Sequence, residues 1–407
     1  MRVTTNLIFD QNLRAINTSQ GELSDLQSQL ASGKRILKPS DDPVGAAQVV
    51  RLTEELNKNE QYQRNISMAT SNLELQETSL RSITDAMNRA RVLTIQSGNG
   101  IFSQDDRKAI ASEIEQLRNQ VVDLMNTQNA TGDFIFAGYQ SEKQAFEFNP
   151  ANDDNPVRFM GDDGTNRVQI SDSVSIQTTS SGKSLFEDVN ARLNFSVVAV
   201  PGVALNKAEI EDQRSFDDFH QDNFDPLNPS NNLYDLRITA LDEITVTHVA
   251  TGADIDTIAF SSGENIRFNG IELNIIGTLG GSVRLDLNRP EKNNMAETLH
   301  KMAQALNDET LSDGEFASII EDTIVGIDNG LSKMSRESSS IGARLNIAQS
   351  VNSALLDSEV TVSQTRSAIQ DVDYAQASSD FARQETALEA AFASFPRIAN
   401  LSLFNYI

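Results

Sequence analysis

The sequence predicts a mainly α-helical protein with an inserted β domain, and three observations lead to this fold class. Apolar residues recur at every seventh position near both ends of the chain. Between these runs, over residues 151–287, the period changes to two and turn residues become frequent. Only 6% of the 407 residues are aromatic, which suits thin bundles better than one large core. We therefore expect a long antiparallel helical bundle or coiled coil built from both termini.

The longest heptad run lies in the C-terminal third of the chain. From Ile320 to Ile369, eight apolar residues are spaced by seven with no intervening proline. This spacing puts a narrow apolar stripe along one helix, which would be roughly 75 Å long at 1.5 Å per residue. A helix of this length needs partner helices of matching length, and the N-terminal third provides them.

The first predicted helix ends at a glycine and is followed by a strong helix start. Gly33 suits the position after a helix C-terminus, and Lys34 and Arg35 suit the negative end of that helix's dipole. Asp42 is a good N-cap, with Pro43 at the first helical position. The second helix should therefore begin at Pro43, and its apolar heptads continue to about Ser97.

A third helix should follow after a short turn, antiparallel to the second. Ser103 and Asp106 have the spacing of a capping box, and Gly132 is the expected stop. The next segments alternate with period two. We expect 134–148 as one hairpin, 157–160 and 167–170 as strands on either side of a polar turn, and 265–268 with 271–276 as a hairpin around Asn269-Gly270. Residues 236–240 and 244–249 are expected as further strands. We expect residues 206–234 to be a long loop.

The two apolar ends of the chain are the candidate assembly surface. A single pair of helices buries little and leaves half of its apolar surface in water, so neighbouring subunits are the expected cover. Pro396 should weaken or kink the last helix. The predicted assembly residues are Phe9, Leu13, Ile16, Leu23, Leu30, Leu388, Phe392, Phe395, Ile398, Leu401 and Leu403.

Composition and motif searches exclude several classes of function. A net charge of −25 disfavours nucleic acid and anionic membranes as partners, and no run of eighteen apolar residues predicts a membrane span. The absence of cysteine excludes disulfides and thiolate metal sites. The N-terminus lacks the pattern of a secretory signal. The three histidines are far apart, and no HExxH, P-loop or GxGxxG occurs. We predict no catalytic, cofactor or metal site.

Two segments resemble the flagellin superfamily. LASGKRILKPSDDPVGAA at 30–47 is similar to its N-terminal signature, and IGARLN at 341–346 is similar to its C-terminal helix motif. MRVTTN at the start, GDFIFAGYQSEKQAF at 132–146 and ANLSLFNYI at the end resemble the hook-associated members. The alternative within the family is a filament-forming flagellin. A remote third alternative is an enzymatic activity in the inserted domain, residues 151–287.

The resemblance implies a flagellin-like architecture and a structural role in the bacterial flagellum. It implies a terminal coiled-coil domain (1–44 with 363–407), a helical domain with a β-hairpin (45–150 with 288–362) and an outer β-rich domain (151–287). It also implies export without a cleaved signal through the type III apparatus. The implied partners are copies of the chain in a helical or ring assembly, the first hook-associated protein, flagellin and an export chaperone.

Overall fold

The computed structural model describes residues 5–99, 102–152, 155–200 and 202–399; the side chains of residues 5, 6, 8, 9 and 395–399 lie outside the description. The described chain forms two compact units. The first contains Met1–Ala69, Val168–Ile176 and Asn346–Ile407, and the second contains Thr70–Arg167 and Gln177–Leu345. The helices are α1 (Thr5–Ser32), α2 (Pro43–Ser97), α3 (Gln104–Met125), α4 (Gln213–Asn223), α5 (Met295–Asn307), α6 (Asp313–Gln370) and α7 (Tyr374–Ala399).

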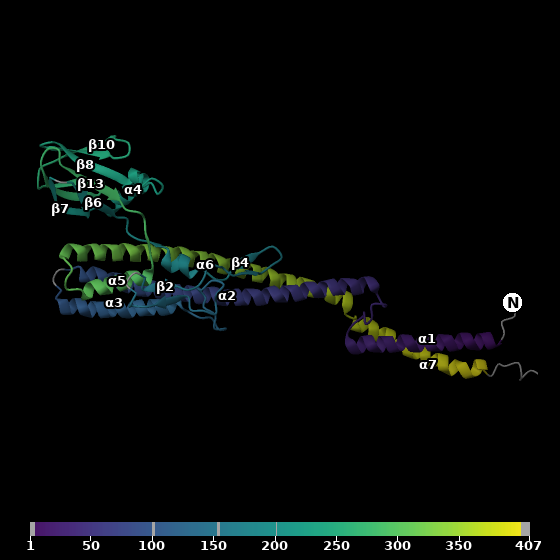
Figure 1. Cartoon of the computed structure of the whole chain (residues 1–407). Helices are drawn as coiled ribbons and strands as arrows, with labels where there is room; N and C mark the ends of the chain where they lie inside the picture. Colours follow the sequence, from purple (N-terminus) through teal and green to yellow (C-terminus); the bar gives the residue numbers. More distant parts are fainter. Residues whose placement is uncertain (1–4, 100–101, 153–154, 201, 400–407) are drawn as a thin grey trace, which may run out of the picture. The chain divides into compact units, whose positions relative to one another are not determined.

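The predicted helical class with a β-rich insert is confirmed, and α6 carries the whole heptad run without a break (Figure 1). Seven of the eight heptad positions from Ile320 to Val362 are buried, and Ile369 is partly buried. The seam is thus the buried face of one continuous helix of 58 residues. In the first unit this face meets α2, where the Asn59 amide donates to Ser358 across the pair.

In the second unit, α3, α5 and the adjoining parts of α2 and α6 form a helical bundle around buried Leu80, Met87, Ile114, Leu299 and Met334. The predicted capping box at Ser103 and Asp106 is present. The predicted stop at Gly132 is wrong, because α3 ends at Met125. The cause is Asn126, whose side chain donates to the Phe146 carbonyl (2.9 Å) and accepts from the Phe146 N–H (2.8 Å).

The predicted hairpin at 134–148 is wrong. The strands predicted at 157–160 and 167–170 are present, but they do not pair with each other. Instead β1 (Phe146–Phe148) pairs with β2 (Val157–Phe159), and β3 (Arg167–Gln169) pairs with β4 (Ser175–Gln177). The Asp162 carboxylate explains the difference, because it accepts the N–H groups of Tyr139 (2.9 Å) and Gly164 (2.8 Å). These bonds tie two loops together where the sequence suggests hairpin turns, and Gly138 supplies the positive φ of 73° that this requires.

The remaining strands build a β-rich region with two sheets, one in the order β10-β9-β8-β13-β6 and one in the order β11-β12-β7 (Figure 1). Both enclose one core that includes Phe216, Tyr234, Leu273 and Leu285. The bounds are β6 (Phe195–Ala199), β7 (Val203–Ile210), β8 (Leu233–Ala240), β9 (Glu243–His248), β10 (Asp254–Ala259), β11 (Asn265–Phe268), β12 (Ile271–Gly277) and β13 (Ser282–Leu287), and we call residues 194–288 the outer domain.

The strands predicted at 236–240 and 244–249 are present as β8 and β9, which pair with each other, and the predicted β11–β12 hairpin at Asn269-Gly270 is confirmed. The expected loop at 206–234 is wrong, because it contains part of β7 and all of α4. Asp212 caps α4 by accepting the N–H groups of Arg214 and Ser215, and Phe216 and Phe219 are buried beneath it. Local capping and two aromatic anchors thus order a segment whose polar composition suggested a loop.

Short elements connect the outer domain to the bundle. They are a π-helical turn (Lys183–Glu187), β5 (Val189–Asn190) and β14 (Lys292–Asn293). A 3₁₀ turn (Pro229–Asn232) lies within the outer domain. The strands β5 and β14 pair antiparallel. None of the helices in the described ranges is both long enough and apolar enough to cross a membrane.

Candidate assembly surface

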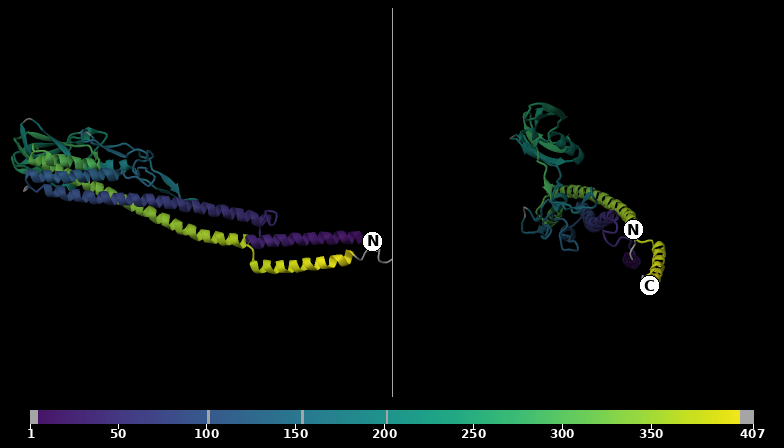
Figure 2. Two further views of the ribbon diagram at one scale, coloured as in Figure 1. Left: turned by 90° about the horizontal axis from the view of Figure 1, so that it is seen from below. Right: turned by 90° about the vertical axis from the view of Figure 1, so that its right-hand side faces the viewer.

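The helices α1 and α7 lie side by side as an antiparallel pair, as the views in Figures 1 and 2 show. Their register is fixed by a β-bridge between Lys34 and Asp371 and, further along the helices, by the Gln384 amide donating to Glu22 (2.6 Å). We call α1 and α7 the terminal pair. The first residue of α1 and the last residue of α7 therefore lie at the same end of this pair.

The terminal pair buries very little of its apolar surface. Among its described side chains, Ile16 (8% exposed) and Ala377 (5%) are buried, whereas Leu13 (38%) and Phe392 (53%) are exposed. Two helices can cover only one narrow stripe of each other, so larger apolar side chains beside that stripe stay in water. Such a surface is typical of an interaction site rather than of a finished core.

The structure places the predicted assembly residues as follows. Ile16 is buried in the seam, and Leu23, Leu30 and Leu388 are partly buried. Leu13 and Phe392 are exposed. The side chains of Phe9, Phe395 and Ile398, and all of Leu401 and Leu403, lie outside the description. The helix α7 continues through Pro396 to Ala399. Whether these residues make assembly contacts remains a prediction.

A compact joint connects the terminal pair to α2 and α6, and we call residues 33–42 and 371–373 the elbow. Gly33 has a φ of 70°, as expected of the residue after a helix. The Val372 N–H donates to the Gly33 carbonyl (3.0 Å), and the Arg35 N–H donates to the Gln370 carbonyl (2.7 Å). The interruptions after α1 and after α6 therefore lie together and are bonded to each other.

Arg35 acts on a different helix from the one that the sequence suggested. Its guanidinium donates to the Ile369 carbonyl at the C-terminal end of α6 (2.7 Å) and pairs with Asp42 (3.3 Å). A cation at this end of a helix satisfies a carbonyl that lacks an intrahelical partner and complements the helix dipole. Arg35 therefore complements a helix dipole as predicted, but the helix is α6, which is distant in sequence, and not α1.

Two aspartates explain the acidic part of the N-terminal signature. The Asp41 carboxylate accepts the N–H groups of Leu37 (3.1 Å) and Lys38 (2.8 Å), and Asp42 accepts the Gly45 N–H (2.9 Å), confirming Asp42 as the N-cap of α2. The Gly45 N–H, followed by the Arg35 guanidinium, holds the pKa of Asp42 below its ordinary value. A side chain at Gly45 would come within 2.5 Å of the Asp42 carboxylate, which explains the glycine.

The second motif, IGARLN, contains an arginine whose role the sequence analysis missed. Arg344 donates to Glu337 (3.0 Å), which also accepts the Ser180 hydroxyl (2.6 Å). From α2, the buried Gln76 amide donates to the Thr178 carbonyl (2.6 Å). Residues 178–180 are therefore clamped to both long helices. The seven-residue spacing of Glu337 and Arg344, two turns apart on one helix face, was the available signal.

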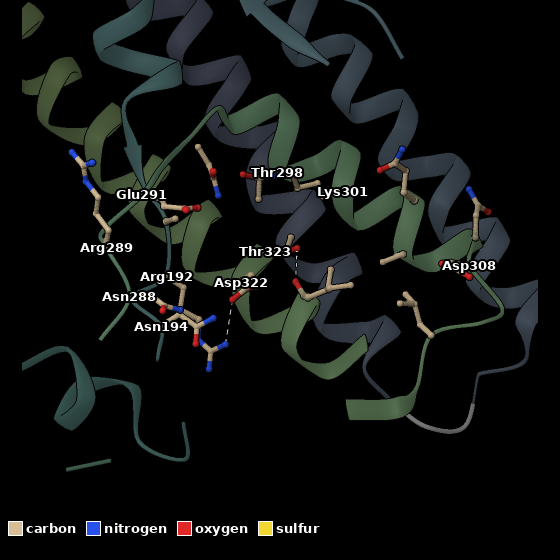
Figure 3. Close-up of a pocket in the computed structure, with 17 residues that line it drawn as sticks. Arg192, Asn194, Asn288, Arg289, Glu291, Thr298, Lys301, Asp308, Asp322 and Thr323 are labelled. Carbon is tan, nitrogen blue, oxygen red and sulfur yellow. Dashed lines mark hydrogen bonds and ion pairs between the residues drawn. The ribbon is translucent and has the colours of Figure 1, made fainter. Parts of the chain in front are cut away.

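The described residues also contain one sizeable cleft and three histidines. A cleft of about 1060 Å³ lies in the second unit between α5, α6 and the strands that lead to the outer domain (Figure 3). No group of three or more His, Cys, Asp or Glu within the described ranges could hold a metal. The histidines have local partners: the Asn288 carbonyl for His220 (2.7 Å), Thr251 for His248 (2.8 Å) and Arg118 for His300 (2.9 Å).

Two family models match the chain, one at each end. The bacterial flagellin N-terminal helical region matches residues 3–141, and the bacterial flagellin C-terminal helical region matches residues 324–407. The matches cover the terminal pair, the elbow and both motifs described above. Flagellin of Listeria monocytogenes is 32% identical over 129 residues, which are 32% of this chain and 45% of that protein.

Similarity over the full length of the chain is found to a hook-associated protein rather than to a flagellin. Flagellar hook-associated protein 3 of Escherichia coli strain K12 is 24% identical over 404 residues, 99% of both chains. The protein of that name from Salmonella typhimurium is 37% identical over 147 residues, which are 36% of this chain and 46% of that protein.

Solved structures agree in fold. A crystal structure of Xanthomonas campestris FlgL is 26% identical with a TM-score of 0.55, covering 78% of this chain and 99% of that one. The hook-associated protein 3 structure from Legionella pneumophila, at 22% identity, has a TM-score of 0.58 over 78% of this chain and 97% of that one, which shows similarity of fold. Because the two flagellin regions together match more than half of the 407 residues, this chain belongs to the flagellin family.

Proposed function

We propose that this chain is a structural adaptor of the bacterial flagellum that joins the hook to the flagellin filament by helical self-assembly through its terminal pair. Its partners in this proposal are other copies of itself, the first hook-associated protein on the hook side and flagellin on the filament side. An export chaperone would hold the chain before it passes through the type III apparatus, and the mature protein would lie outside the cell.

One observation carries this proposal: the terminal pair exposes Leu7, Leu13 and Phe392 (46%, 38% and 53%) beside a seam that buries little. Each large apolar side chain that neighbouring subunits bury contributes about 1.5–3 kcal/mol. Many such contacts repeated around a ring can hold a mechanical joint, whereas exposed ion pairs contribute at most about 1 kcal/mol each.

The full-length similarity favours a junction protein over a filament-forming flagellin. The Listeria flagellin match spans about a third of the chain, whereas the hook-associated relative from Escherichia coli matches from end to end. The names of these relatives describe flagellar proteins, and we propose a structural, non-enzymatic role for the present chain. Within it, we propose that residues 1–44 with 363–407 form the assembly core.

The test is a double substitution, Leu13→Ala with Phe392→Ala, in cells that lack the chromosomal copy of the gene. Because Leu13 and Phe392 are exposed (38% and 53%), we expect the double substitution to change the melting temperature of the purified monomer only slightly. Incorporation at the hook should fail, so flagellin should be found in the medium rather than in filaments. Leu227→Ala is the matched control, since this residue of the outer domain is 85% exposed.

Two outcomes would contradict the proposal. If the double variant builds filaments of normal length and strength, the terminal pair is not the joint. If the double substitution clearly lowers the melting temperature of the monomer, these side chains pack within their own chain. Assembly is then not the reason for their presence. Cryo-electron microscopy of the native junction would then show which surface does make the contact.

A further inference from the structure

The outer domain is attached to the helical bundle by two strands that are paired at both ends but not in the middle. On the bundle side, β5 and β14 form a short ladder, extended by the Ala191 N–H donating to the Glu291 carbonyl (3.0 Å). On the outer side, the Asn288 N–H donates to the Asn194 carbonyl (3.1 Å). We call residues 188–194 and 288–293 the stalk.

The middle of the stalk lacks a ladder. Among the described residues no backbone hydrogen bond joins 192–193 to 289–290, and Pro290 has no N–H to donate. The bundle side of the stalk, in contrast, is anchored to α6: the Asn329 amide donates to the Asn190 carbonyl (2.9 Å), and the Lys333 ammonium donates to the Asp188 carbonyl (2.7 Å). Bending should therefore concentrate at the unpaired middle.

Arg192 lies in this unpaired middle and its side chain is only 6% exposed. Its guanidinium engages both sides of the stalk. Toward the bundle it pairs with Glu321 (2.6 Å) and Asp322 (3.2 Å) on α6, and Figure 3 shows Arg192 beside Asp322 at the edge of the cleft. Toward the outer domain its Nε donates to Gln213 (2.5 Å), the first residue of α4.

Gln213 continues this contact into the outer domain. Its amide donates to the Leu193 carbonyl (3.2 Å) and to Asp217 (2.7 Å) on α4. Each of the three guanidinium nitrogens of Arg192 thus has its own acceptor, an arrangement that the rigid, planar fork of arginine permits and a lysine cannot reproduce. The cleft of about 1060 Å³ beside it is lined by Asn288, Arg289 and Glu291 from the stalk, so it leaves room for the strands to move.

We propose that residues 192–193 and 289–290 are a hinge for the outer domain, and that Arg192 is the latch that holds this hinge in one position. With the latch closed, the outer domain keeps a fixed orientation on the bundle. Without it, the two paired ends of the stalk remain intact and the domain swings about the middle. This inference does not depend on the proposed role in the flagellum.

The test is a distance measurement between two spin labels on the full chain. Ala208 on β7 and Ser335 on α6 are exposed, and the chain has no cysteine, so Ala208→Cys with Ser335→Cys gives two unique labelling sites. We expect one narrow distance distribution in this parent. Adding Arg192→Ala should broaden it and add a second population at a shifted distance, and Arg192→Lys should give an intermediate width.

A matched control and a second variant keep the test decisive. Arg289→Ala removes an exposed arginine from the same cleft, for which the described residues provide no ion pair, and should leave the distribution narrow. Glu321→Ala with Asp322→Ala opens the latch from α6 by removing two carboxylates that are about half exposed (51% and 50%), and circular dichroism of each variant checks that it is folded. The latch proposal would be overturned if the distance distribution of the parent were as broad as those of the latch variants. It would also be overturned if the distributions of the latch variants were as narrow as that of the parent.

Discussion

Arg344 is the single residue whose loss we expect to weaken the helical bundle most clearly without touching its apolar core. Its side chain is 16% exposed and that of Glu337 is 19% exposed, so the pair is largely shielded from solvent. Arg344→Ala leaves the Glu337 carboxylate without its cation next to the Ser180 hydroxyl. We expect the free energy of unfolding to fall by about 1–3 kcal/mol, measured by urea denaturation followed by circular dichroism.

Arg336→Ala is the matched control for this change, because Arg336 lies two turns away on α6 and is exposed. It should change the free energy of unfolding by no more than about 0.5 kcal/mol, as surface substitutions usually do. Equal effects of the two substitutions would show that the contact to residues 178–180 contributes nothing specific. The expected difference would instead explain why an arginine occurs in this motif.

The Asp42 carboxylate gives a prediction for pH. Its pKa lies below the ordinary value of about 3.9, chiefly through the Gly45 N–H and then through Arg35. Because the pKa of Asp42 is lower in the folded protein than in the unfolded chain, its carboxylate stabilises the elbow at pH values above the unfolded-state pKa. This stabilisation is lost as the pH falls through the folded-state pKa. We therefore expect the protection of the first turn of α2 to fall only at pH values under about 3.9.

Titration of the Asp42 carboxyl group by nuclear magnetic resonance tests both causes. In Arg35→Ala the midpoint should rise but stay below the ordinary value, because the Gly45 N–H remains. If the titration midpoint of Asp42 does not change in this variant, the Arg35–Asp42 ion pair (3.3 Å) does not affect the pKa of Asp42 in solution.

At the level of whole helices, the terminal pair should be the least stable part of the described chain. Ordering each residue costs about 1–2 kcal/mol of backbone entropy, and a pair that buries one narrow stripe recovers little of it. We expect amide hydrogens of α1 and α7 in the dilute monomer to exchange close to the unprotected rate. Those of α2 between Leu73 and Leu93, where many side chains are fully buried, should be strongly protected.

Hydrogen exchange with mass spectrometry measures this difference directly on the full-length protein. Strong protection of residues 9–30 in the monomer would contradict the expectation and would also weaken the argument that the surface of the terminal pair awaits neighbouring subunits. Gain of protection on self-assembly of the chain, confined to α1 and α7, is the result that the proposed function requires.

Helices could be predicted from the sequence more fully than the other elements, for a physical reason. Heptad spacing and local caps are properties of contiguous residues, so α2, α6 and the start of α3 could be predicted. The end of α3 and the pairing of β1 with β2 depend on Asn126 and Asp162, whose partners are distant backbone groups. A turn-rich stretch such as 160–166 looks like a hairpin until the carboxylate that binds both loops is seen.

For the molecule as a whole, the outer domain should be removable at the stalk. Because the Asn288 N–H already donates to the Asn194 carbonyl, deleting residues 195–287 and joining the ends with two glycines bridges neighbouring positions. We expect the remaining helices to melt at the parent temperature, measured by circular dichroism. A large drop in melting temperature would show that the outer domain is part of the bundle's core.

Deleting all of 151–287, the boundary that the sequence suggested for the outer domain, should behave differently. That cut also removes Ile170, Leu185 and Phe186, which are fully or nearly fully buried, and the Thr178 carbonyl that Gln76 binds. The three-domain division remains a prediction, and we propose 194–288 as the separable part. If the two deletion variants have the same melting temperature, the narrower boundary, 194–288, is wrong.

The candidate assembly surface could be predicted only in part. The apolar heptads of Ile16, Leu23 and Leu30 identify a face, and resemblance of the motifs identifies the family. The elbow could not be foreseen, because Arg35 reaches a carbonyl more than three hundred residues away in sequence. Contacts that join the two ends of a chain leave no periodic signal, and only the folded register of α1 with α7 brings them together.

The adjacency of Asn194 and Asn288 has a consequence for engineering and for evolution. A foreign domain whose own termini lie close together could be grafted at this position without stretching either strand. Relatives could likewise exchange this cassette by recombination while both chain ends stay unchanged. If the chain assembles as proposed, such a graft would present a cargo enzyme or an antigen in a regular array on the cell's exterior, at a spacing set by the assembly rather than by the cargo.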